Sequence, residues 1–334
     1  MRINWSLASS AWGAALLFAM AMPLLVSGYY GLGVASQALI FILLVQGFNF
    51  TQGLTGRISL GHIGFWAIGA YATGLVTTKL GGGSLLAMVV GVVASCVAAL
   101  VLARLTNGLD SHYLALATLG FGEIVQILAN NWVVVSGGSN GVTNIPPLGI
   151  GPLVLHTPTH LYYFLVAAVV VGCWFTHRFI ASKPGREALS LRQSPVAAES
   201  LGIRTSRVKT VTLMISATFA SVAGSLYAHT YGYISPDAFS FAAMLTVLAM
   251  LVLGGPGSVA GPVIGALLLT YVPEWSRVGS QYWQLIYGLL LFVMVLWAPR
   301  GIVGLPRQIR SWSARVRPSV QPERPSREEE RMLR

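Results

Sequence analysis

Charged residues are scarce in this chain: they make up 9% of its 334 residues, whereas a soluble domain carries about 25%. So few charged side chains cannot cover a water-facing surface of this size, which excludes an ordinary soluble protein. Hydrophobic residues make up 54% of the chain instead. The composition therefore indicates that most of the chain lies in a membrane.

Lysine occurs only three times, and its positions exclude the common nucleotide-binding loop. A P-loop needs the sequence G-x-x-x-x-G-K-[ST], whose main-chain amides and lysine hold phosphate. Neither Lys79 nor Lys183 is followed by Ser or Thr, and Val208 precedes Lys209 where glycine is required. The motifs H-E-x-x-H and C-x-x-C are also missing. We therefore expect no catalytic residues and no ATP binding by this chain alone.

Cysteine occurs only twice, and both residues, Cys96 and Cys173, fall in apolar segments. Two isolated cysteines provide neither a disulfide framework nor the ligand spacing of a metal site. The sequence therefore predicts two buried, unpaired thiols and no bound metal.

Apolar stretches of membrane-spanning length recur along the whole chain. A bilayer core about 30 Å thick needs roughly 20 apolar residues in a helix. The alternating ten-residue segments of a membrane β-barrel do not occur, so these stretches should be helices with internally bonded backbones. The predicted fold class is all-α, a polytopic transmembrane helical bundle of about ten spans. The candidate spans are residues 12–30, 33–53, 60–79, 84–104, 111–135, 159–180, 208–232, 240–255, 259–277 and 281–298.

Three of these spans have alternative interpretations. Gly254-Gly255-Pro256-Gly257 separates 240–255 from 259–277, so these two segments could instead be a re-entrant pair or broken helices. The first segment, 12–30, could be a cleaved secretory signal rather than a retained helix.

Basic residues are distributed as the positive-inside rule requires, with lysine and arginine in short cytoplasmic loops. With the N-terminus inside, all of the 21 basic residues except Lys79 and Arg277 fall in cytoplasmic segments. We therefore predict cytoplasmic N- and C-termini, a cytoplasmic loop at 181–207 and an external loop at 136–158. The net charge of +11 then reflects orientation and anionic membrane lipid rather than nucleic-acid binding.

The chain divides into a membrane domain and a tail. Residues 1–305 hold all the apolar stretches. Residues 306–334 are rich in Pro, Arg and Glu and cannot bury enough apolar surface to fold alone. The sequence therefore predicts one transmembrane domain and a disordered, basic cytoplasmic tail.

Within the cytoplasmic loop, residues 194–202 have the signals of a short helix. Ser194 can cap its first turn, Pro195 suits the first helical position, and Gly202 suits the C-terminal stop. Such a helix could fit a groove of a partner protein, and the alternative is a plain linker turn. Its exposed residues are expected to be small, namely Ala197, Ala198 and Ser200.

Polar residues recur at helical spacing inside two spans. Glu123, at the middle of 111–135, is followed at i+3 and i+7 by Gln126 and Asn130 on the same helix face. A carboxylate at this depth is costly in lipid and should face the protein interior. Gln46 and Asn49 repeat the spacing in 33–53. These residues predict either a translocation path or a hydrogen-bonded clasp between helices.

Glycines are concentrated where helices must approach one another closely. Gly257-x-x-x-Gly261-x-x-x-Gly265 has the spacing of a small-residue packing face. Gly61 and Gly69 lie at the start of the third predicted span. A phosphate-binding loop is the alternative, but close helix packing explains glycines within a membrane better.

Five sequence blocks, between about residues 45 and 305, carry most of the recognisable motifs. In their order along the chain, they resemble the branched-chain amino-acid permeases of ABC importers, LivM type. The blocks are Gly47-Phe-Asn49…Gly53-Leu-Thr-Gly56-Arg-Ile-Ser59-Leu-Gly61-His62, Tyr113-Leu-Ala-Leu-Ala-Thr118-Leu-Gly-Phe-Gly-Glu123, Gly137-Gly-Ser-Asn-Gly141, Gly185-Arg-Glu-Ala-Leu…Ala197-Ala-Glu-Ser-Leu-Gly202, and Leu253-Gly-Gly255…Gly261-Pro262…Gly265-Ala266.

The resemblance implies a transporter assembled from several subunits in the bacterial inner (plasma) membrane. This chain would pair with a sister permease as a hetero- or homodimer, and an extracytoplasmic solute-binding protein would deliver cargo. Two cytoplasmic ATPase subunits would bind ATP and Mg, so no cofactor is expected in this chain. The coupling motif of the family maps onto Arg186, Ala197, Ala198, Glu199 and Gly202.

The sequence does not name the cargo: the family includes importers for Leu, Ile and Val, and relatives for urea, short amides and other small solutes. Our hypothesis for the mechanism is alternating access. ATP-driven closure of the ATPases would shift the coupling helix and alternate the access of a central cavity. The chain departs from the family at Leu109-Asp110-Ser-His-Tyr113, where many relatives have an Arg-Gly-Asp-Tyr-like run.

Two other classes of function remain as alternatives. An ion-coupled secondary transporter or channel would use Glu123 as a proton or cation site and would need no ATPase. An intramembrane enzyme would need a paired nucleophile and base or a metal-ligand spacing, and neither occurs in the spans.

Overall fold

The computed structural model describes residues 28–109, 111–150, 153–155 and 157–276, with residues 23, 288–289 and 301–304 in addition. The predicted spans at 12–30 and 281–298 lie almost entirely outside the described residues. The predicted tail at 306–334 and Asp110 also lie outside them.

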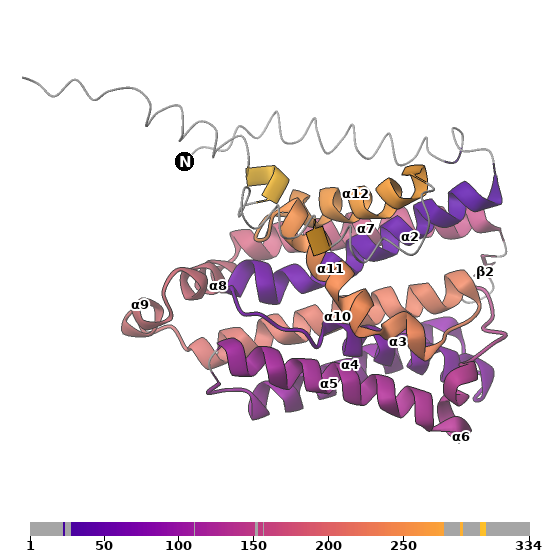
Figure 1. Cartoon of the computed structure of the whole chain (residues 1–334), viewed down its shortest axis with the longest axis horizontal. Helices are drawn as coiled ribbons and strands as arrows, with labels where there is room; N and C mark the ends of the chain where they lie inside the picture. Colours follow the sequence, from indigo (N-terminus) through magenta and orange to yellow (C-terminus); the bar gives the residue numbers. More distant parts are fainter. Residues whose placement is uncertain are drawn as a thin grey trace, which may run out of the picture.

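The described residues form a bundle of helices that lie alongside one another (Figure 1). This confirms the predicted all-α class, since the remaining element among these residues is a hairpin of β1 (Gly149–Ile150) and β2 (Leu153–Val154). The longer helices are α2 (Tyr29–Phe48), α3 (His62–Thr78), α4 (Ser84–Leu105), α5 (Ser111–Asn131), α7 (Pro158–Ala181), α10 (Thr205–Tyr231), α11 (Phe241–Gly254) and α12 (Ala260–Ser276). The shorter segments are the π-helix η1 (Asn49–Leu54), α6 (Val133–Ser136), η2 (Gly138–Asn140), α8 (Lys183–Gln193), α9 (Pro195–Ser200) and η3 (Pro236–Phe239).

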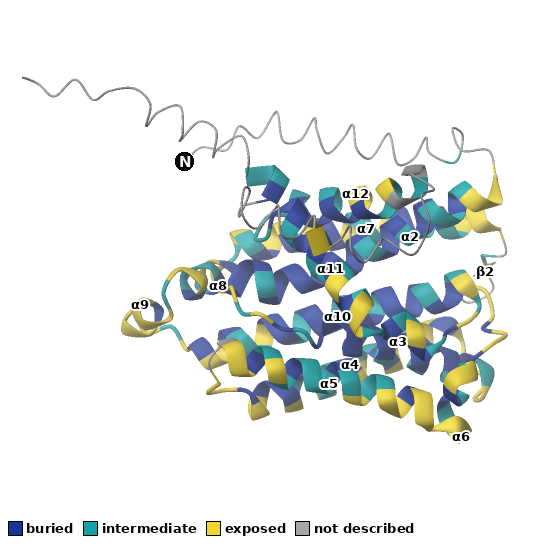
Figure 2. Cartoon of the chain, viewed as in Figure 1, coloured by how far each residue is buried: buried dark blue, intermediate teal, exposed yellow. Residues whose placement is uncertain are grey.

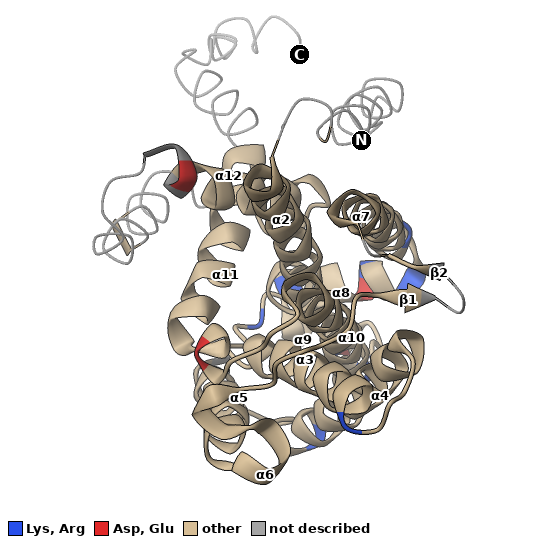
Figure 3. Cartoon of the chain, turned by 90° about the vertical axis from the view of Figure 1, so that its right-hand side faces the viewer, with Lys and Arg blue, Asp and Glu red and all other residues tan. Residues whose placement is uncertain are grey.

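Five helical segments among the described residues are long and apolar enough to cross a membrane. Figure 3 shows how few Lys, Arg, Asp and Glu residues the bundle carries along its length. α3 is not one of these five segments, because it has only 17 residues; at roughly 1.5 Å per residue it is about 25 Å long. The five segments are Tyr29–Leu54, Ser84–Leu105, His112–Asn131, Pro158–Ala181 and Thr205–Tyr231.

The outer face of α4 has the composition of a surface that contacts lipid. Val89, Val93 and Val97 lie on this face and are each more than half exposed. The opposite face carries Ala87 and Ala99, which are fully buried. Large apolar side chains outside and small ones inside reverse the pattern of a helix in a water-soluble protein.

The centre of the bundle is the contact between α3 and α10, and Figure 2 shows buried residues concentrated in these helices. Gly69 of α3 lies so close to α10 that a Cβ there would be 2.2 Å from the carbonyl oxygen of Ser221. A Cβ on Gly224 of α10 would likewise be 2.2 Å from the carbonyl oxygen of Trp66. Two glycines that face in opposite directions therefore allow the two backbones to touch.

The two ends of the bundle differ in character (Figure 1). α8 and α9 lie at one end, which we call the α9 end, and α6 and the hairpin lie at the other, the α6 end. Lys79, which the sequence places outside, lies at the α6 end, where its ammonium donates a 2.8 Å hydrogen bond to the carbonyl oxygen of Val135. The separation of Lys79 from the basic loop at 181–207 matches the predicted charge asymmetry.

Two predicted spans differ from the structure. The prediction of one helix over 111–135 is wrong at its end: α5 stops at Asn131, because Trp132 leaves the helical region with φ −86° and ψ 66°, and α6 follows. α11, with 14 residues, is only about 21 Å long at roughly 1.5 Å per residue. Figures 1 and 3 show that α11 runs steeply across the bundle, while α12 runs along it. The structure therefore favours the broken-helix alternative for 240–277.

Both cysteines are free, as the sequence predicts. Cys173 is buried in α7, and Cys96 of α4 is half-buried, with its sulfur 3.4 Å from the hydroxyl of Thr218. A contact of this kind joins α4 to α10 without a covalent bond.

Candidate functional site

The start of α9 forms as its sequence predicts. The hydroxyl of Ser194 accepts a 3.2 Å hydrogen bond from the amide of Ala197, and Pro195 occupies the first helical position. This cap satisfies one of the amides that have no partner within the first turn of a helix.

The end of α9 is a Schellman motif, in which a residue with a left-handed backbone stops the helix. Gly202 adopts φ +77° and donates a 2.9 Å hydrogen bond to the carbonyl oxygen of Glu199. The amide of Ile203 donates a 3.1 Å hydrogen bond to the carbonyl oxygen of Ala198. α9 is therefore a separately capped, six-residue helix at the end of the bundle.

The surface of α9 differs from the expected one. Ala198 was expected to be exposed, but only 1% of its surface is accessible, so this expectation is wrong. Ala197 and Ser200 are exposed as expected. The exposed apolar area comes instead from two larger side chains, Val196 and Leu201, which are each 78% exposed. α9 thus presents a small apolar surface that is not covered by the described residues.

Two further residues of the predicted coupling motif connect neighbouring elements. The carboxylate of Glu199 accepts a 2.8 Å hydrogen bond from the hydroxyl of Thr205, the first residue of α10. The guanidinium of Arg186 donates a 2.6 Å hydrogen bond to the carbonyl oxygen of Ala181 at the end of α7. α9 is thereby attached to α10, and α8 is attached to α7.

α8 is fixed on the membrane helices by a separate apolar cluster. Ala188 and Leu191 of α8 are buried there, against the π-helix η1 and the ends of α7 and α10. A displacement of α8 would therefore disturb η1 directly. The buried members of the cluster are Phe50, Leu54, Phe179, Ala188, Leu191 and Val208.

A polar junction lies beside this cluster and is centred on Arg192 of α8, a residue that no local sequence signal predicts to be functional. Its guanidinium donates hydrogen bonds to the carbonyl oxygens of Gly53 in η1 and of Pro256 in the turn between α11 and α12. Partial burial lowers the pKa of Arg192, but an arginine stays protonated at physiological pH. One side chain thus joins α8, η1 and the α11–α12 turn.

Two glycines make room for this side chain. Gly56 has φ +71°, and a Cβ there would lie 3.0 Å from Cγ of Arg192. Gly257 has φ +87°, and a Cβ there would lie 2.5 Å from Nη1 of Arg192. The glycines are therefore needed both for their backbone conformation and for the space that they leave.

Asn49 belongs to the same junction. Its side-chain oxygen accepts a 2.8 Å hydrogen bond from the amide of Gly257, and its side-chain nitrogen donates one of 2.9 Å to the carbonyl oxygen of Ser258. Gln46 donates a 2.8 Å hydrogen bond to the carbonyl oxygen of Val259. Asn49 is fully buried, so within the described part of the chain it does not face an open path. Its hydrogen bonds to the α11–α12 turn favour the predicted clasp between helices over the translocation path.

The predicted glycine face is only partly helical. α12 begins at Ala260, so Gly257 lies in the preceding turn and the three glycines do not share one helix face, contrary to the expectation. A Cβ on Gly265 would be 1.8 Å from the carbonyl oxygen of Met250, and one on Gly261 would be 2.0 Å from that of Gly255. These two glycines allow α12 to touch α11 and the turn.

Gly61 allows a similar contact between the start of α3 and α5. A Cβ on Gly61 would be 2.6 Å from the carbonyl oxygen of Thr118. The hydroxyl of Thr118 also accepts a 2.9 Å hydrogen bond from the amide of Leu60. The start of α3 is therefore fixed against α5 at backbone distance.

The polar stripe on α5 lies at the surface of the chain rather than in its core. Glu123 and Gln126 are half-buried, and Asn130 is exposed. A Cβ on Gly120 would meet no atom within 4 Å, so this face is open one turn before Glu123. Gln126 makes a single long hydrogen bond of 3.5 Å to the carbonyl oxygen of Pro236. Within the described residues, this one hydrogen bond of the stripe goes to η3, and none reaches another of the longer helices.

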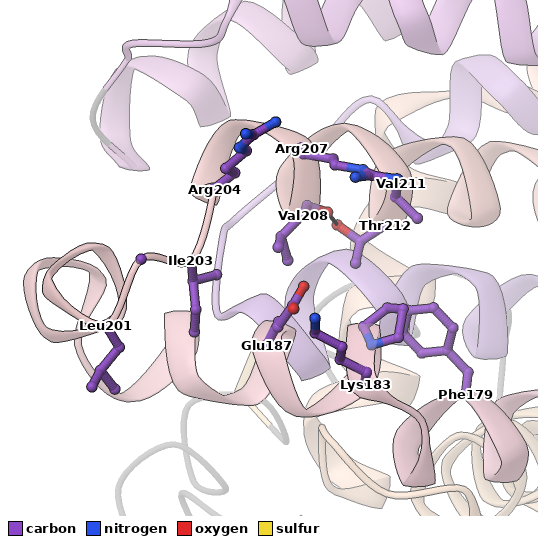
Figure 4. Close-up of a pocket in the computed structure, with 12 residues that line it drawn as sticks. Phe179, Lys183, Glu187, Leu201, Ile203, Arg204, Arg207, Val208, Val211 and Thr212 are labelled. Atoms are coloured by element: carbon purple, nitrogen blue, oxygen red, sulfur yellow. Dashed lines mark hydrogen bonds between the residues drawn. The ribbon is translucent and has the colours of Figure 1, made fainter.

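A hollow of about 630 Å³ opens at the α9 end between α8 and α10 (Figure 4). Lys183 and Glu187 point from α8 toward α10 across it, as Figure 4 shows. Its lining combines basic and apolar residues, and we call it the α8–α10 groove. The groove is lined by Phe179, Lys183, Pro184, Glu187, Leu201, Gly202, Ile203, Arg204, Arg207, Val208, Val211 and Thr212.

The chain matches known proteins over most of its length. The family model described as "Branched-chain amino acid transport system / permease component" matches residues 30–295. LivM of Salmonella typhimurium, a high-affinity branched-chain amino acid transport system permease protein, is 34% identical over 317 residues, which cover 88% of this chain and 74% of LivM.

More distant relatives carry similar names. LivH of Escherichia coli K12 is 28% identical and aligns over 80% of this chain and 92% of its own length. BraD of Pseudomonas aeruginosa is 26% identical over 83% of this chain and 94% of its own length. No solved structure matches the chain. The chain is thus a membrane protein that belongs to the permease-component family of branched-chain amino acid transport systems.

Proposed function

We propose that this chain is one of two permease subunits of an ATP-driven importer, and that the translocation path lies between the two subunits. The observation that carries this proposal is the position of Glu123 on the surface of an apolar helix. It stands near the middle of His112–Asn131, one of the segments able to cross a membrane. Glu123 makes no hydrogen bond or ion pair to another described residue.

Lipid is an unfavourable environment for such a side chain. A carboxylate at the bilayer centre costs roughly 2.5–3.5 kcal/mol on insertion scales, so acidic residues in spans face protein or water. Because the described residues cover Glu123 and Gln126 only partly and leave Asn130 exposed, a second subunit or an aqueous path should cover them. A cavity between two permeases would provide both a second subunit and an aqueous path. This supports the proposal that Glu123, Gln126 and Asn130 line the translocation path.

The relatives support a pair of related permeases. E. coli K12 has both a LivM and a LivH protein, and each matches more than three quarters of this chain. A sister of the LivH kind would make a heterodimer, and a second copy of this chain would make a homodimer.

The α9 end is the proposed docking site of two ATPase subunits, which would bind ATP and Mg. The exposed side chains of Val196 and Leu201 supply an apolar contact on a rigid, doubly capped helix. Because most of the basic residues that the structure describes fall on this side, the α9 end and both termini should be cytoplasmic. Arg186, Ala197, Glu199 and Gly202 would then form or support the contact, and Ala198 would support it from beneath.

The α6 end would face outward and receive the solute-binding protein. Trp132, Val133 and Val134 are well exposed there. We propose branched-chain amino acids or a related small polar solute as the cargo, because LivM and LivH carry that description. ATP-driven movement of α9 would be transmitted through α8 to η1 and alternate the access of the cavity.

Reconstituted uptake tests the proposal. The chain would be placed in vesicles with its sister permease, the ATPases and the binding protein, and uptake of labelled Leu, Ile, Val and urea would be measured. We expect uptake that requires ATP and all subunits. Uptake that persists without ATPases but collapses with the ion gradient would instead support an ion-coupled transporter.

Orientation can be tested separately with a cysteine at an exposed position of α9. In a background lacking Cys96 and Cys173, Ala197→Cys should react with a membrane-impermeant thiol reagent only after the cytoplasmic face is opened. Reaction from outside intact cells would overturn the assignment of the α9 end.

A further inference from the structure

The α8–α10 groove lies at the depth where the protein surface changes from apolar to charged. On α7, Trp174 is 60% exposed, and His177 and Arg178 follow it about one turn later. Phe179, the next residue, lines the groove. Because tryptophan is enriched at the boundary between lipid and water, Trp174 indicates that this part of α7 lies at the edge of the hydrocarbon layer.

The wall of the groove formed by α10 changes from charged to apolar at the same depth. On α10, Arg204 and Arg207 are exposed, and one turn later Val211 lines the groove with 36% of its surface accessible. Both walls are therefore charged toward the α9 end and apolar toward the middle of the bundle. A phospholipid has the same order of chemical groups, from phosphate to acyl chain.

The charge of the groove is positive. Lys183, Arg204 and Arg207 line it together with a single acidic residue, Glu187. Arg204 and Arg207 also stand at the first turn of α10, where the partial positive charge of a helix start adds to their own. Basic pockets between membrane helices on the cytoplasmic side suit anionic lipid headgroups.

The size of the groove and its apolar floor also fit a phospholipid. A hollow of about 630 Å³ is within the range of pockets that hold small organic ligands. Phe179, Val208 and Val211 form an apolar floor next to the basic rim. An inorganic anion would leave this floor uncovered, whereas the upper part of an acyl chain would cover it.

We propose that the α8–α10 groove binds an anionic phospholipid of the leaflet that contacts the α9 end. Lys183, Arg204 and Arg207 hold the phosphate, and the acyl chain lies along Phe179, Val208 and Val211. Because Leu201 and Gly202 close one side of the groove, the lipid contacts the C-terminal end of α9. Anionic lipid would thus stabilise the base of the segment assigned to ATPase docking, and only this consequence rests on the proposed function.

The test is lipid retention on the purified full-length chain. Delipidated protein would be titrated with phosphatidylglycerol, with phosphatidylcholine of the same acyl chains, and with inorganic phosphate, and bound species would be counted by native mass spectrometry. We expect retention of phosphatidylglycerol and weak binding of the other two probes. Equal retention of both lipids, or phosphate binding as tight as that of phosphatidylglycerol, would overturn the proposal.

Matched variants locate the site. The double variant Arg204→Gln/Arg207→Gln should bind phosphatidylglycerol about thirtyfold more weakly, the loss expected for two basic residues near an anionic lipid. Arg204→Lys/Arg207→Lys keeps both charges and should retain the lipid. Arg104→Gln, an exposed arginine at the same end of the bundle but outside the groove, is the control.

Two outcomes would count against the assignment. Phosphatidylglycerol affinity that is unchanged in the glutamine double variant would refute it. Release of the lipid when the ATPases bind would show that a partner protein occupies the groove in the complete assembly. Lipid retention does not depend on the cargo or on ATP, so its failure would leave the importer proposal standing.

Discussion

The guanidinium of Arg192 donates a hydrogen bond to the carbonyl oxygen of Gly53, 139 positions earlier in the chain. Gly53 stands near the end of a π-helix, where carbonyl groups lack partners within the helix. The same guanidinium reaches the carbonyl oxygen of Pro256 at 3.4 Å. Arg192 thus connects the loop that would face the ATPases with two irregular segments inside the bundle, and π-helices of this kind occur frequently at functional sites.

Replacement of Arg192 tests this connection. Arg192→Ala should lower the free energy of unfolding by about 1.5 kcal/mol, the low end for hydrogen bonds from a charged donor, because the side chain is partly exposed. It should also increase the ATP hydrolysed per solute imported, because α8 would move without η1. Thermal unfolding and coupled uptake in vesicles measure the two effects.

Arg104→Ala is the control for Arg192, since Arg104 is an exposed arginine at the same end of the bundle and lies outside the proposed ATPase contact. Equal ATP-to-solute ratios in the two variants would contradict a special role for Arg192. Arg192→Lys should fall between them, because an ammonium reaches one carbonyl more readily than two.

A methyl group at position 257 should disturb the same junction from the other side. Gly257→Ala forces a left-handed backbone on alanine, which costs about 1–2 kcal/mol, and brings a Cβ to 2.5 Å from Arg192 Nη1. The double variant Gly257→Ala/Arg192→Ala removes the clash but not the backbone strain, so the two losses should not add. Thermal unfolding in detergent would measure the loss of stability of each single variant and of the double variant.

Gly33→Ala is a suitable comparison for Gly257→Ala. Gly33 lies within α2, and a Cβ there meets no atom within 4 Å, so alanine should be neutral or slightly stabilising. A loss at Gly33 as large as that at Gly257 would contradict the specific role of the turn.

The fold could be predicted where an apolar run has clear boundaries. The prediction of 84–104 agrees within one residue with α4, which begins after Gly83, and 159–180 agrees equally well with α7. Hydropathy alone does not give the direction of a helix, and α11 is as apolar as a true span although it crosses the bundle. The end of α5 at Trp132 depends on one backbone torsion that no composition reveals.

The candidate site was predictable only as far as its local signals extend. The caps at Ser194 and Gly202 act within one helical turn, and the sequence identifies both. The burial of Ala198 could not be read in the same way, because a small residue suits either an exposed or a packed position. Arg192 was missed because its partners are main-chain carbonyls far away in the sequence, and only the glycines at positions 56 and 257 hint at the junction.

Glu123 should be dispensable for folding and needed for transport. Because no described residue pairs with it, Glu123→Leu should leave thermal unfolding of the isolated chain unchanged or raise its midpoint. Uptake in the complete assembly should fall strongly, since the substitution removes a polar group from the proposed path. Thermal unfolding and uptake are measured on the same preparations.

The neighbouring exposed residue provides the control for Glu123. Ile124 is 58% exposed on the same helix, and Ile124→Leu should change neither quantity. If Glu123→Leu destabilised the isolated chain by several kcal/mol, Glu123 would be a structural clasp, and the path assignment would have to be abandoned.

Adjacent alanines of α9 should respond differently to enlargement. Ala198 is buried, so Ala198→Leu overpacks its site and should cost about 1–3 kcal/mol of stability together with transport. Ala197 is exposed, so Ala197→Trp should leave the melting temperature unchanged and still abolish ATP-driven uptake by obstructing the ATPases. Co-purification of the ATPases with each variant separates the two causes. An Ala197→Trp chain that retains its ATPases and full uptake would mean that α9 is not where they dock.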